Sequence, residues 1–466
     1  MQWARMALIA ALLGLVSTAS ADPVDDYVRS QLQSRRFPGV SLAVVKDGRI
    51  VKAAGYGLAS LELDAPATEK TVYEIGSISK QFAANAVLLL VEDGKVRLDD
   101  PVSKYLTNSP AAWSAITVRH ILTHTAGLAD FDTGNIGFSY RREYTPEEFV
   151  ELLGRQPLGF QPGERWNYTN GFPLLGMVIE RASGLPYTEF VRSRIFAPLG
   201  MDSARFKTAS DVVPQRADGY FYKDGAYRHG ENLRPAIIAP NGGIMMNVVD
   251  FGKWDIAITQ GRLLRAESLK AMMTPVRLND GRTVSHGLGW FMDSFNGHRF
   301  GAHWGTTVAG YSAVIRRYVD DRVTVIMLAN LDDGGLSIDT MSKRIADSFV
   351  PGVDVHGLSP KTDPVPAETV RLKEILAAVG AGREDDRAPG LATRLPQPVR
   401  DRIAATMRTA TAFEFLGADA VGDEHFNLDP ALRTIKWYRV RTADGMRYFT
   451  LRLSSDGRLL GAILED

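Results

Sequence analysis

Ser77-Ile78-Ser79-Lys80 opens the helical stretch on which the predicted fold and chemistry of this chain rest. The apolar pattern is helical from Ser77 to Asp93, and Gly94 is a typical stop signal. Residues three apart on a helix share a face, so the Lys80 amine can lie beside the Ser77 hydroxyl. A serine hydroxyl is a weak nucleophile until a neighbouring base or cation activates it. The four residues therefore predict a nucleophile and its activating amine on one helical turn.

Length and composition indicate a globular protein of two or three domains. The chain has 466 residues, of which 45% are hydrophobic and 23% are charged. Lysine plus arginine equals aspartate plus glutamate, at 54 each. A balanced charge favours neither nucleic acid nor an anionic membrane as a partner.

The first 21 residues have the pattern of an export signal. Arg5 supplies a positive start, residues 6–16 form a short apolar core, and Ala19-Ser20-Ala21 is a small-residue cleavage site. The apolar core is too short to span a bilayer, and a buried N-terminal helix is the alternative. There is no cysteine, which excludes disulfides and thiol catalysis. We expect a periplasmic or secreted protein with no membrane span after cleavage of residues 1–21.

Residues 22–350 are predicted to form one domain of the α+β class. Its early and late parts contain β-branched and aromatic runs, whereas residues 100–285 consist mainly of helical segments cut by Pro/Gly loops. The predicted strands are residues 40–45, 50–57, 289–293, 310–317 and 322–330, and a closing helix is predicted at 338–349. The simplest arrangement joins these strands in one antiparallel sheet flanked by helices, with the helical middle as an inserted lobe.

A proline-rich linker is predicted at residues 351–366, where four prolines occur with few large apolar residues. Residues 367–466 are enough for a small α+β domain. Its predicted helices are 370–378 and 399–408, and its predicted strands are 435–441, 446–454 and 459–464. This segment contains no catalytic pattern, and its role is left open.

Two further motifs follow the first along the chain. Ser77 is the only serine followed three residues later by lysine. Tyr168-Thr169-Asn170 is the only Tyr-x-Asn, and His303-Trp304-Gly305 is the only His-x-Gly. The three motifs fall on a helix, a loop and the late strands, in that order.

With these motifs the chain resembles the serine β-lactamase and penicillin-binding protein family, in its class C-like branch with D-Ala-D-Ala carboxypeptidase, D-aminopeptidase and esterase relatives. The resemblance covers roughly residues 37–349. It also includes Gly55-Tyr56-Gly57, Tyr73-Glu74-Ile75-Gly76, Leu98-Asp99-Asp100-Pro101, the run His120-Ile121-Leu122-Thr123-His124-Thr125-Ala126-Gly127-Leu128, Pro162-Gly163 and Pro198-Leu199-Gly200-Met201.

The resemblance implies catalytic roles for Ser77, Lys80 and Tyr168. Ser77 would attack a carbonyl and become acylated, Lys80 would ease formation of its alkoxide, and Tyr168 would carry the proton to the leaving group. Which of Lys80 and Tyr168 takes the first proton is left open. Asn170 would bind the substrate amide or orient Lys80, and a loop residue bonded to its own backbone is the alternative.

The resemblance also implies an oxyanion hole formed by the backbone N–H groups of Ser77 and Thr306. Gly305 would let the strand approach the substrate closely because it carries no side chain. Many relatives have Lys-Thr-Gly at this third motif, where a cation holds a substrate carboxylate. A histidine with an ordinary pKa near 6.5 is largely neutral at pH 7, so His303 argues against strong β-lactamase activity. His303 is nevertheless expected to be a substrate-binding residue, and a strand histidine satisfied in the core is the alternative.

Other sequence features have structural explanations as well as functional ones. His120 and His124 have the i, i+4 spacing of metal ligands, but no glutamate follows His120, so no metal site is predicted. An aromatic loop could line the cleft or could simply pack; it contains Tyr220, Tyr222, Tyr227 and His229. Asn241-Gly242-Gly243 matches a family loop that borders the active site and supplies backbone shape.

The function predicted from the sequence is that of an exported serine hydrolase that forms an acyl-enzyme on Ser77 without metal or cofactor. Its substrates would be small amides or peptides with D-amino acids, or esters. Two rivals are an esterase of the same fold and a slowly acylated penicillin-binding sensor without real turnover. The natural substrate and the oligomeric state are left open.

Overall fold

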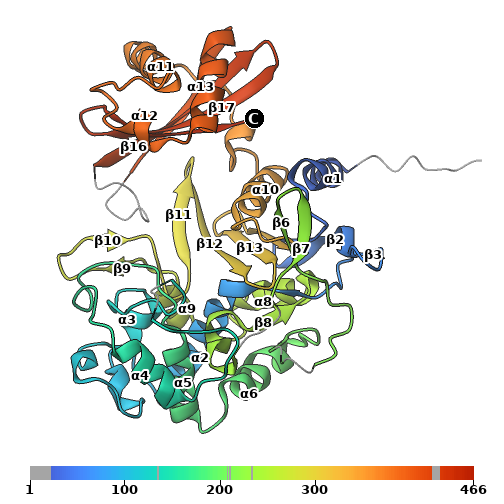
Figure 1. The fold of residues 1–466 in the computed structure, drawn as a ribbon, viewed down its shortest axis with the longest axis vertical. Helices are drawn as coiled ribbons and strands as arrows, with labels where there is room; N and C mark the ends of the chain where they lie inside the picture. The colour runs from blue at the N-terminus through green and yellow to red at the C-terminus, as the bar shows by residue number, and fades with distance from the viewer. Residues whose placement is uncertain (1–21, 134–135, 207, 209–210, 232–234, 422–430) are drawn as a thin grey trace, which may run out of the picture.

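The computed structural model describes residues 22–133, 136–206, 208, 211–231, 235–421 and 431–466. The predicted export signal, residues 1–21, lies outside the described residues. Two units are visible in Figure 1, a larger one that contains a seven-stranded sheet and a smaller one formed by the last hundred residues.

The larger unit is built on an antiparallel sheet with the strand order β11-β12-β13-β14-β1-β2-β3. Its strands are β1 Gly39–Lys46, β2 Arg49–Ser60, β3 Ala65–Pro66, β11 Phe291–Phe295, β12 His298–Thr307, β13 Tyr311–Tyr318 and β14 Val323–Ala329. The first hairpin joins the late strands where β1 pairs with β14, with Val44 opposite Val325. The predicted α+β architecture with an antiparallel sheet is confirmed.

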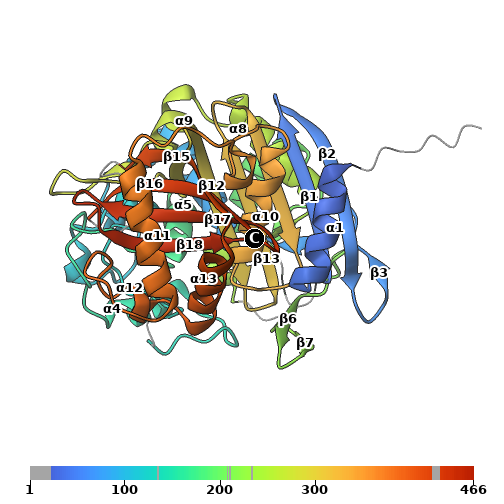
Figure 2. The ribbon, with the colours of Figure 1, turned by 90° about the horizontal axis from the view of Figure 1, so that it is seen from above.

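Helices cover both faces of this sheet. Alternate residues of β1 point to opposite sides, so Leu42 packs with α1 Pro23–Arg35 and α10 Leu336–Asp347, while Ala43 belongs to the core around α2 Ser79–Glu92. Figure 2 shows α1 and α10 close together on one face. The second face carries α2 and α8 Val248–Thr259, and it holds most of the buried apolar side chains.

The inserted lobe contains the short helices and strands between the two halves of the sheet. Its helices are α3 Val118–Leu122, α4 Pro146–Gly154, α5 Pro173–Ser183, α6 Tyr187–Val191, α7 Ala239–Gly242 and α9 Ala266–Met272. Its strands are β4 Tyr73–Glu74, β5 Arg205–Phe206, β6 Tyr220–Lys223, β7 Ala226–His229, β8 Ile244–Met246, β9 Val276–Arg277 and β10 Thr283–Val284. The predicted helical middle is therefore present, with small sheets between the helices.

Strand β12 is the main difference from the predicted strand ranges. It spans His298–Thr307, which no predicted strand range covered; the stretch contains Phe300, Trp304 and two threonines, which favour a strand, but also two glycines, which do not. Pairing with β11 and β13 on its two sides makes it a strand. Gly289, placed in a predicted strand, instead adopts φ 77° against the backbone of α2.

The smaller unit has helices on one face of a four-stranded antiparallel sheet with the order β15-β16-β17-β18. Its elements are α11 Pro366–Gly380, α12 Leu391–Arg394, α13 Gln397–Thr409, β15 Ala412–Ala420, β16 Leu432–Thr442, β17 Gly445–Ser454 and β18 Leu459–Glu465. Strand β15 was not predicted. The predicted linker, residues 351–366, is partly packed, because Val355 and Leu358 are buried against Trp437.

The aromatic loop packs within the fold. In the β6–β7 hairpin, the Tyr220 hydroxyl hydrogen-bonds Glu62, and the Tyr227 hydroxyl donates to the carbonyl of Arg36 at 2.8 Å. Of the two alternatives for this loop, its contacts favour packing. In the part of the chain that is described, no helix combines the length and apolar character needed to cross a membrane.

Candidate active site

Ser77 and Lys80 lie at the junction of a tight turn and the central helix. A 3-10 turn, Gly76–Ile78, contains Ser77 and runs directly into α2, which begins at Ser79 rather than at the predicted Ser77. The Lys80 Nζ donates to the Ser77 Oγ at 2.9 Å. The structure therefore brings together the hydroxyl and the amine of the first motif.

Lys80 is a fully buried amine with neutral neighbours. Its Nζ lies 3.1 Å from Asn170 Oδ1 and 3.4 Å from the carbonyl oxygen of Asn241, and 4.9 Å from the centre of the Tyr168 ring. Among the described residues, no carboxylate forms an ion pair with it. Burial lowers the pKa of Lys80 to about 7, although the charges of Asp130 and Asp132 act in the opposite direction. Lys80 is thus available as a base near neutral pH.

Tyr168 faces the same serine from the inserted lobe. Burial raises the pKa of its phenol, while a hydrogen bond with Ser77 acts in the opposite direction. The ring packs against His124 at 4.5 Å and stacks on Phe291 at 5.8 Å between ring centres. With its pKa raised above the ordinary value near 10, Tyr168 is a neutral phenol at pH 7.

Asn170 connects Lys80 to a carboxylate that the sequence did not single out. Its Oδ1 accepts from Lys80 and also from Asn241 Nδ2 at 3.0 Å. Its backbone N–H and its Nδ2 donate to Asp130 at 3.0 and 3.2 Å. Of the two roles implied for Asn170, these contacts favour orientation of Lys80.

Strand β12 lies directly against the backbone of the nucleophile turn. A Cβ added at Gly305 would lie 2.1 Å from the carbonyl oxygen of Ile75 and 2.9 Å from the Ser77 nitrogen. A Cβ at Gly76, which has φ 53°, would lie 2.9 Å from the Thr306 nitrogen. Glycine is therefore required at position 305 for contact between strand and turn, a different reason from the predicted approach to substrate.

The hydrogen-bond pattern of β12 orients the Thr306 N–H. The Arg299 carbonyl accepts from Val319 at 3.0 Å, so the odd-numbered residues of β12 exchange hydrogen bonds with β13. The even-numbered residues face the opposite edge, where pairing with β11 stops at Ala302. The N–H of Thr306 thus points to the same open edge that Ser77 borders, as one of the two donors in the predicted oxyanion hole would.

His303 lies behind this edge and is only 1% exposed. Its Nδ1 is 2.7 Å from the carbonyl oxygen of Trp304, and its ring packs at 5.1 Å on Phe291. Burial and the charge of Lys80 hold the pKa of His303 well below its usual range. The imidazole is neutral, so it cannot supply the cation that would bind a substrate carboxylate.

Two other buried histidines share this neighbourhood. His124 Nδ1 accepts from the Thr169 N–H at 3.2 Å, and the ring of His286 lies 4.9 Å from that of His124. Burial lowers the pKa of His286 to about 3 and that of His124 well below its usual value. His120 instead completes a helix-capping box with Thr117, so the histidine pair noted in the sequence is divided between two structural tasks. His286 was missed because no motif surrounds it.

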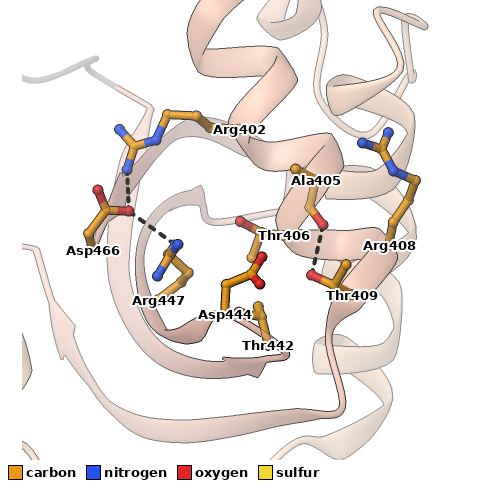
Figure 3. A pocket seen from close by; sticks show the side chains of 9 residues that line it. All are labelled: Arg402, Ala405, Thr406, Arg408, Thr409, Thr442, Asp444, Arg447 and Asp466. Atoms are coloured by element: carbon orange, nitrogen blue, oxygen red, sulfur yellow. Dashed lines mark hydrogen bonds and ion pairs between the residues drawn. The ribbon is translucent and has the colours of Figure 1, made fainter.

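Two of the pockets lie in different units of the molecule. A pocket of about 470 Å³ borders the candidate site, and its lining includes Asp130, Trp166 and Asn167. A pocket of about 250 Å³ lies in the smaller unit, where Arg402 and Arg447 both pair with Asp466 (Figure 3). The lining of this second pocket is Arg402, Ala405, Thr406, Arg408, Thr409, Thr442, Asp444, Arg447 and Asp466. Only the first of these two pockets adjoins the Ser77 and Lys80 neighbourhood, because Asp130 in its lining hydrogen-bonds Asn170, which accepts from Lys80.

Fold and site together define the class of protein: residues 24–348 match the family described as Beta-lactamase. The chain belongs to this family, and the predicted family and fold are confirmed. It is 31% identical over 323 residues to Penicillin-binding protein 4* of Bacillus subtilis (strain 168). That match covers 65% of this chain and 70% of the relative. It is also 31% identical over 210 residues to Esterase EstB of Burkholderia gladioli, covering 42% of this chain and only 54% of the esterase.

Solved structures give the same result. The D-amino acid amidase of Ochrobactrum anthropi SV3, complexed with L-phenylalanine amide, is similar with a TM-score of 0.61 and 26% identity. That match covers 70% of this chain and 99% of the amidase. The octameric penicillin-binding protein homologue from Pyrococcus abyssi is similar in fold over 94% of both chains, with a TM-score of 0.60 and 22% identity.

Proposed function

We propose that this chain is an exported serine hydrolase that cleaves small amides or peptides through an acyl-enzyme on Ser77. The observation that carries the proposal is the buried Lys80 amine, 2.9 Å from the Ser77 hydroxyl with its pKa lowered to about 7. Such an amine is partly neutral at physiological pH and can accept the serine proton.

Lys80 is the better candidate for the first base. Tyr168 is a neutral phenol at pH 7 and would have to lose its own proton before it could accept another. A neutral Lys80 needs no such step. Tyr168, hydrogen-bonded to Ser77, is suited to pass a proton onward to the leaving group.

The reaction then runs in two halves. The Ser77 oxygen bonds to the substrate carbonyl carbon while its proton moves to Lys80, and the N–H groups of Ser77 and Thr306 bind the oxyanion. The bond to the leaving amine or alcohol breaks as that group receives a proton through Tyr168. Water attacks the resulting ester and gives up one proton, which passes through Lys80 or Tyr168 to the Ser77 oxygen as the acid leaves.

The neutral third motif favours substrates that do not depend on a bound carboxylate. His303 carries no charge at pH 7, which argues against efficient β-lactam hydrolysis. The similarity to a D-amino acid amidase supports small D-amino-acid amides as a substrate class, and the similarity to an esterase supports esters as the alternative.

Replacement of Ser77 tests the nucleophile. Ser77→Ala is expected to abolish covalent labelling by a fluorophosphonate probe, because the only proposed attacking oxygen is removed. Ser34→Ala, on the exposed side of α1, is the matched control and should label like the wild type. Undiminished labelling of Ser77→Ala would defeat the assignment.

A substrate panel separates the remaining alternatives. The purified protein is assayed with D-amino-acid amides, D-Ala-D-Ala peptides, short p-nitrophenyl esters and a chromogenic cephalosporin. Fastest turnover of the amides and peptides supports the proposal, and fastest turnover of the esters supports the esterase. An acyl group that mass spectrometry finds trapped on Ser77, without turnover, supports the slowly acylated sensor.

A further inference from the structure

Asp130 is a carboxylate fixed at the edge of the site by four hydrogen bonds. Its Oδ1 accepts from the backbone N–H groups of Asp132 and Thr133, at 2.8 and 3.2 Å. The same carboxylate accepts from the backbone N–H and the side-chain Nδ2 of Asn170, at 3.0 and 3.2 Å. The loop side holds the carboxylate in place, and the carboxylate holds Asn170 at two points.

The hydrogen bonds from Asn170 to Asp130 decide which end of the Asn170 amide faces Lys80. A carboxylate accepts hydrogen bonds and cannot donate them, so it selects the NH₂ end of the amide. The opposite end, Oδ1, then faces the Lys80 Nζ at 3.1 Å and Asn241 Nδ2 at 3.0 Å. A reversed amide would place an oxygen against the Asp130 carboxylate and an NH₂ group against the NH₂ group of Asn241, which is unfavourable at both ends.

We propose that Asp130 is a positioning residue of the hydrolase, which orients the Asn170 amide and thereby holds the Lys80 amine against Ser77. The inference rests on the proposed function, in which Lys80 is the first base. Among the described residues, Asp130 forms no hydrogen bond or ion pair with Ser77 or Lys80, so its effect passes through Asn170.

The interposed amide also moderates the charge that Lys80 experiences. A carboxylate in direct contact would favour the charged lysine strongly and remove it as a base at pH 7. Asp130 is separated from Lys80 by the side chain of Asn170, so its charge raises the pKa of Lys80 by less than burial lowers it. The titratable groups that interact with Lys80 are Asp130, Asp132, Tyr168, His124, His286 and His303.

The direction of the pH effect follows from this arrangement. The Asp130 charge stabilises protonated Lys80, so its removal lowers the pKa of Lys80. If neutral Lys80 is the base, the midpoint of the rise in reactivity with pH moves to lower pH. At the same time, loss of amide orientation lowers the plateau rate, because the amine is no longer held in one place.

The test measures the rate at which a fluorophosphonate probe labels Ser77 between pH 5 and 9. Asp130→Asn is expected to lower the plateau rate about tenfold to a hundredfold, as a displaced base does, and to move the midpoint down by about half a pH unit or more. Asp130→Glu keeps the charge and should return the midpoint toward the wild-type value. The matched control is Asp132→Asn, whose carboxylate accepts from the Tyr140 hydroxyl and, within the described part of the chain, does not hydrogen-bond Asn170; it should keep the wild-type plateau.

The readouts separate positioning from simple stabilisation of the fold. The midpoint does not depend on the amount of folded protein, so a poorly folding Asp130→Asn preparation still gives it. A wild-type plateau in Asp130→Asn would overturn the inference, even if the midpoint moved, because the charge of Asp130 alone accounts for the midpoint. If Ser77→Ala labels as fast as the wild type, the proposed function itself fails, which is a different result.

Discussion

Two buried cations in the larger unit have opposite surroundings and opposite tasks. Lys80 is fully buried against Ser77 and two asparagine oxygens, with no ion pair among the described residues. Arg316 on β13 is 4% exposed, and its guanidinium donates at 2.5 Å to Asp339 on α10. Burial is similar in the two cases, and only the second cation has a carboxylate in contact.

The difference decides what each group can do. Burial lowers the pKa of Lys80 to about 7, which makes it a base. Burial alone would raise the pKa of Asp339, yet the charges of Arg316 and Lys343 hold it below its ordinary value, so that pair stays ionised. An arginine cannot lose its proton under these conditions in any case. The arginine that contacts a carboxylate thus remains a charged structural contact, whereas the buried lysine without one has a pKa near neutral pH.

The largest expected effect comes from removal of the reactive cation. Lys80→Met should lower the labelling rate of Ser77 about 10²- to 10⁴-fold, the range for loss of a general base. Lys80→Arg should be similarly slow, because a guanidinium cannot accept the proton. Probe labelling at pH 7.5 measures both, and Lys70→Met, at an exposed position, is the control. Near-wild-type labelling of Lys80→Met would show that Lys80, like Arg316, does not act as a base.

The same variant also sharpens the comparison through stability. Because the pKa of Lys80 is lower in the folded state, the unfolded state binds more protons between pH 7 and 10.5. The wild type should therefore gain stability with rising pH relative to Lys80→Met, by roughly 1.4 kcal/mol per pH unit in this window. Urea unfolding at several pH values measures this slope, and parallel curves for the two proteins would contradict it.

The next largest expected effect is the loss of stability when the Arg316–Asp339 ion pair is broken. Asp339→Asn leaves Arg316 buried without its partner and should cost about 3 to 5 kcal/mol of unfolding free energy. The double variant Arg316→Met/Asp339→Asn should recover most of this loss, since it removes the buried charge. Asp320→Asn, which breaks an exposed pair with Arg299, is the control and should cost about 1 kcal/mol or less. A loss under about 1 kcal/mol in Asp339→Asn would show that the pair contributes as little as an exposed one.

The smallest expected effect concerns a third cation, at the contact between the units. His356 Nδ1 lies 2.5 Å from Asp354, and its Nε2 lies 2.9 Å from the carbonyl oxygen of Asp466. Burial alone would lower the pKa of His356, but the bond to Asp354 and its charge raise it. The charged imidazole therefore stabilises the folded protein. This stabilisation is fully present below the ordinary pKa near 6.5 and is lost as the pH rises through the raised pKa.

His356→Gln should therefore cost about 1 kcal/mol at pH 5.5 and progressively less at higher pH. Thermal or urea unfolding of the wild type and the variant between pH 5.5 and 8.5 checks this. A difference that stays constant with pH would mean that the imidazole is not charged in the folded protein.

Local features were the ones that the sequence could predict. The first hairpin, the helix after Ser77 and the three motifs depend on spacing within a few residues, which the pattern of side chains reveals directly. The range of strand β12 was missed because two glycines interrupt its aromatic and threonine residues, and its pairing with β11 and β13 is what makes it a strand. Asp130 could have been suspected only as an acid soon after a family-like run, because its partner Asn170 is 40 residues away.

The sequence alone determined which groups are available: one serine, one amine at helical spacing, one phenol and a third motif without a cation. Tertiary structure decided their reactivity. Lys80 and Asn170 are 90 residues apart in the chain. Packing of α2 against the inserted lobe buries the Lys80 amine, and the neutral amide of Asn170 then takes the place of water as its hydrogen-bond partner. Proton affinity depends on solvation and on charges within a few ångströms, and these are properties of the packed chain.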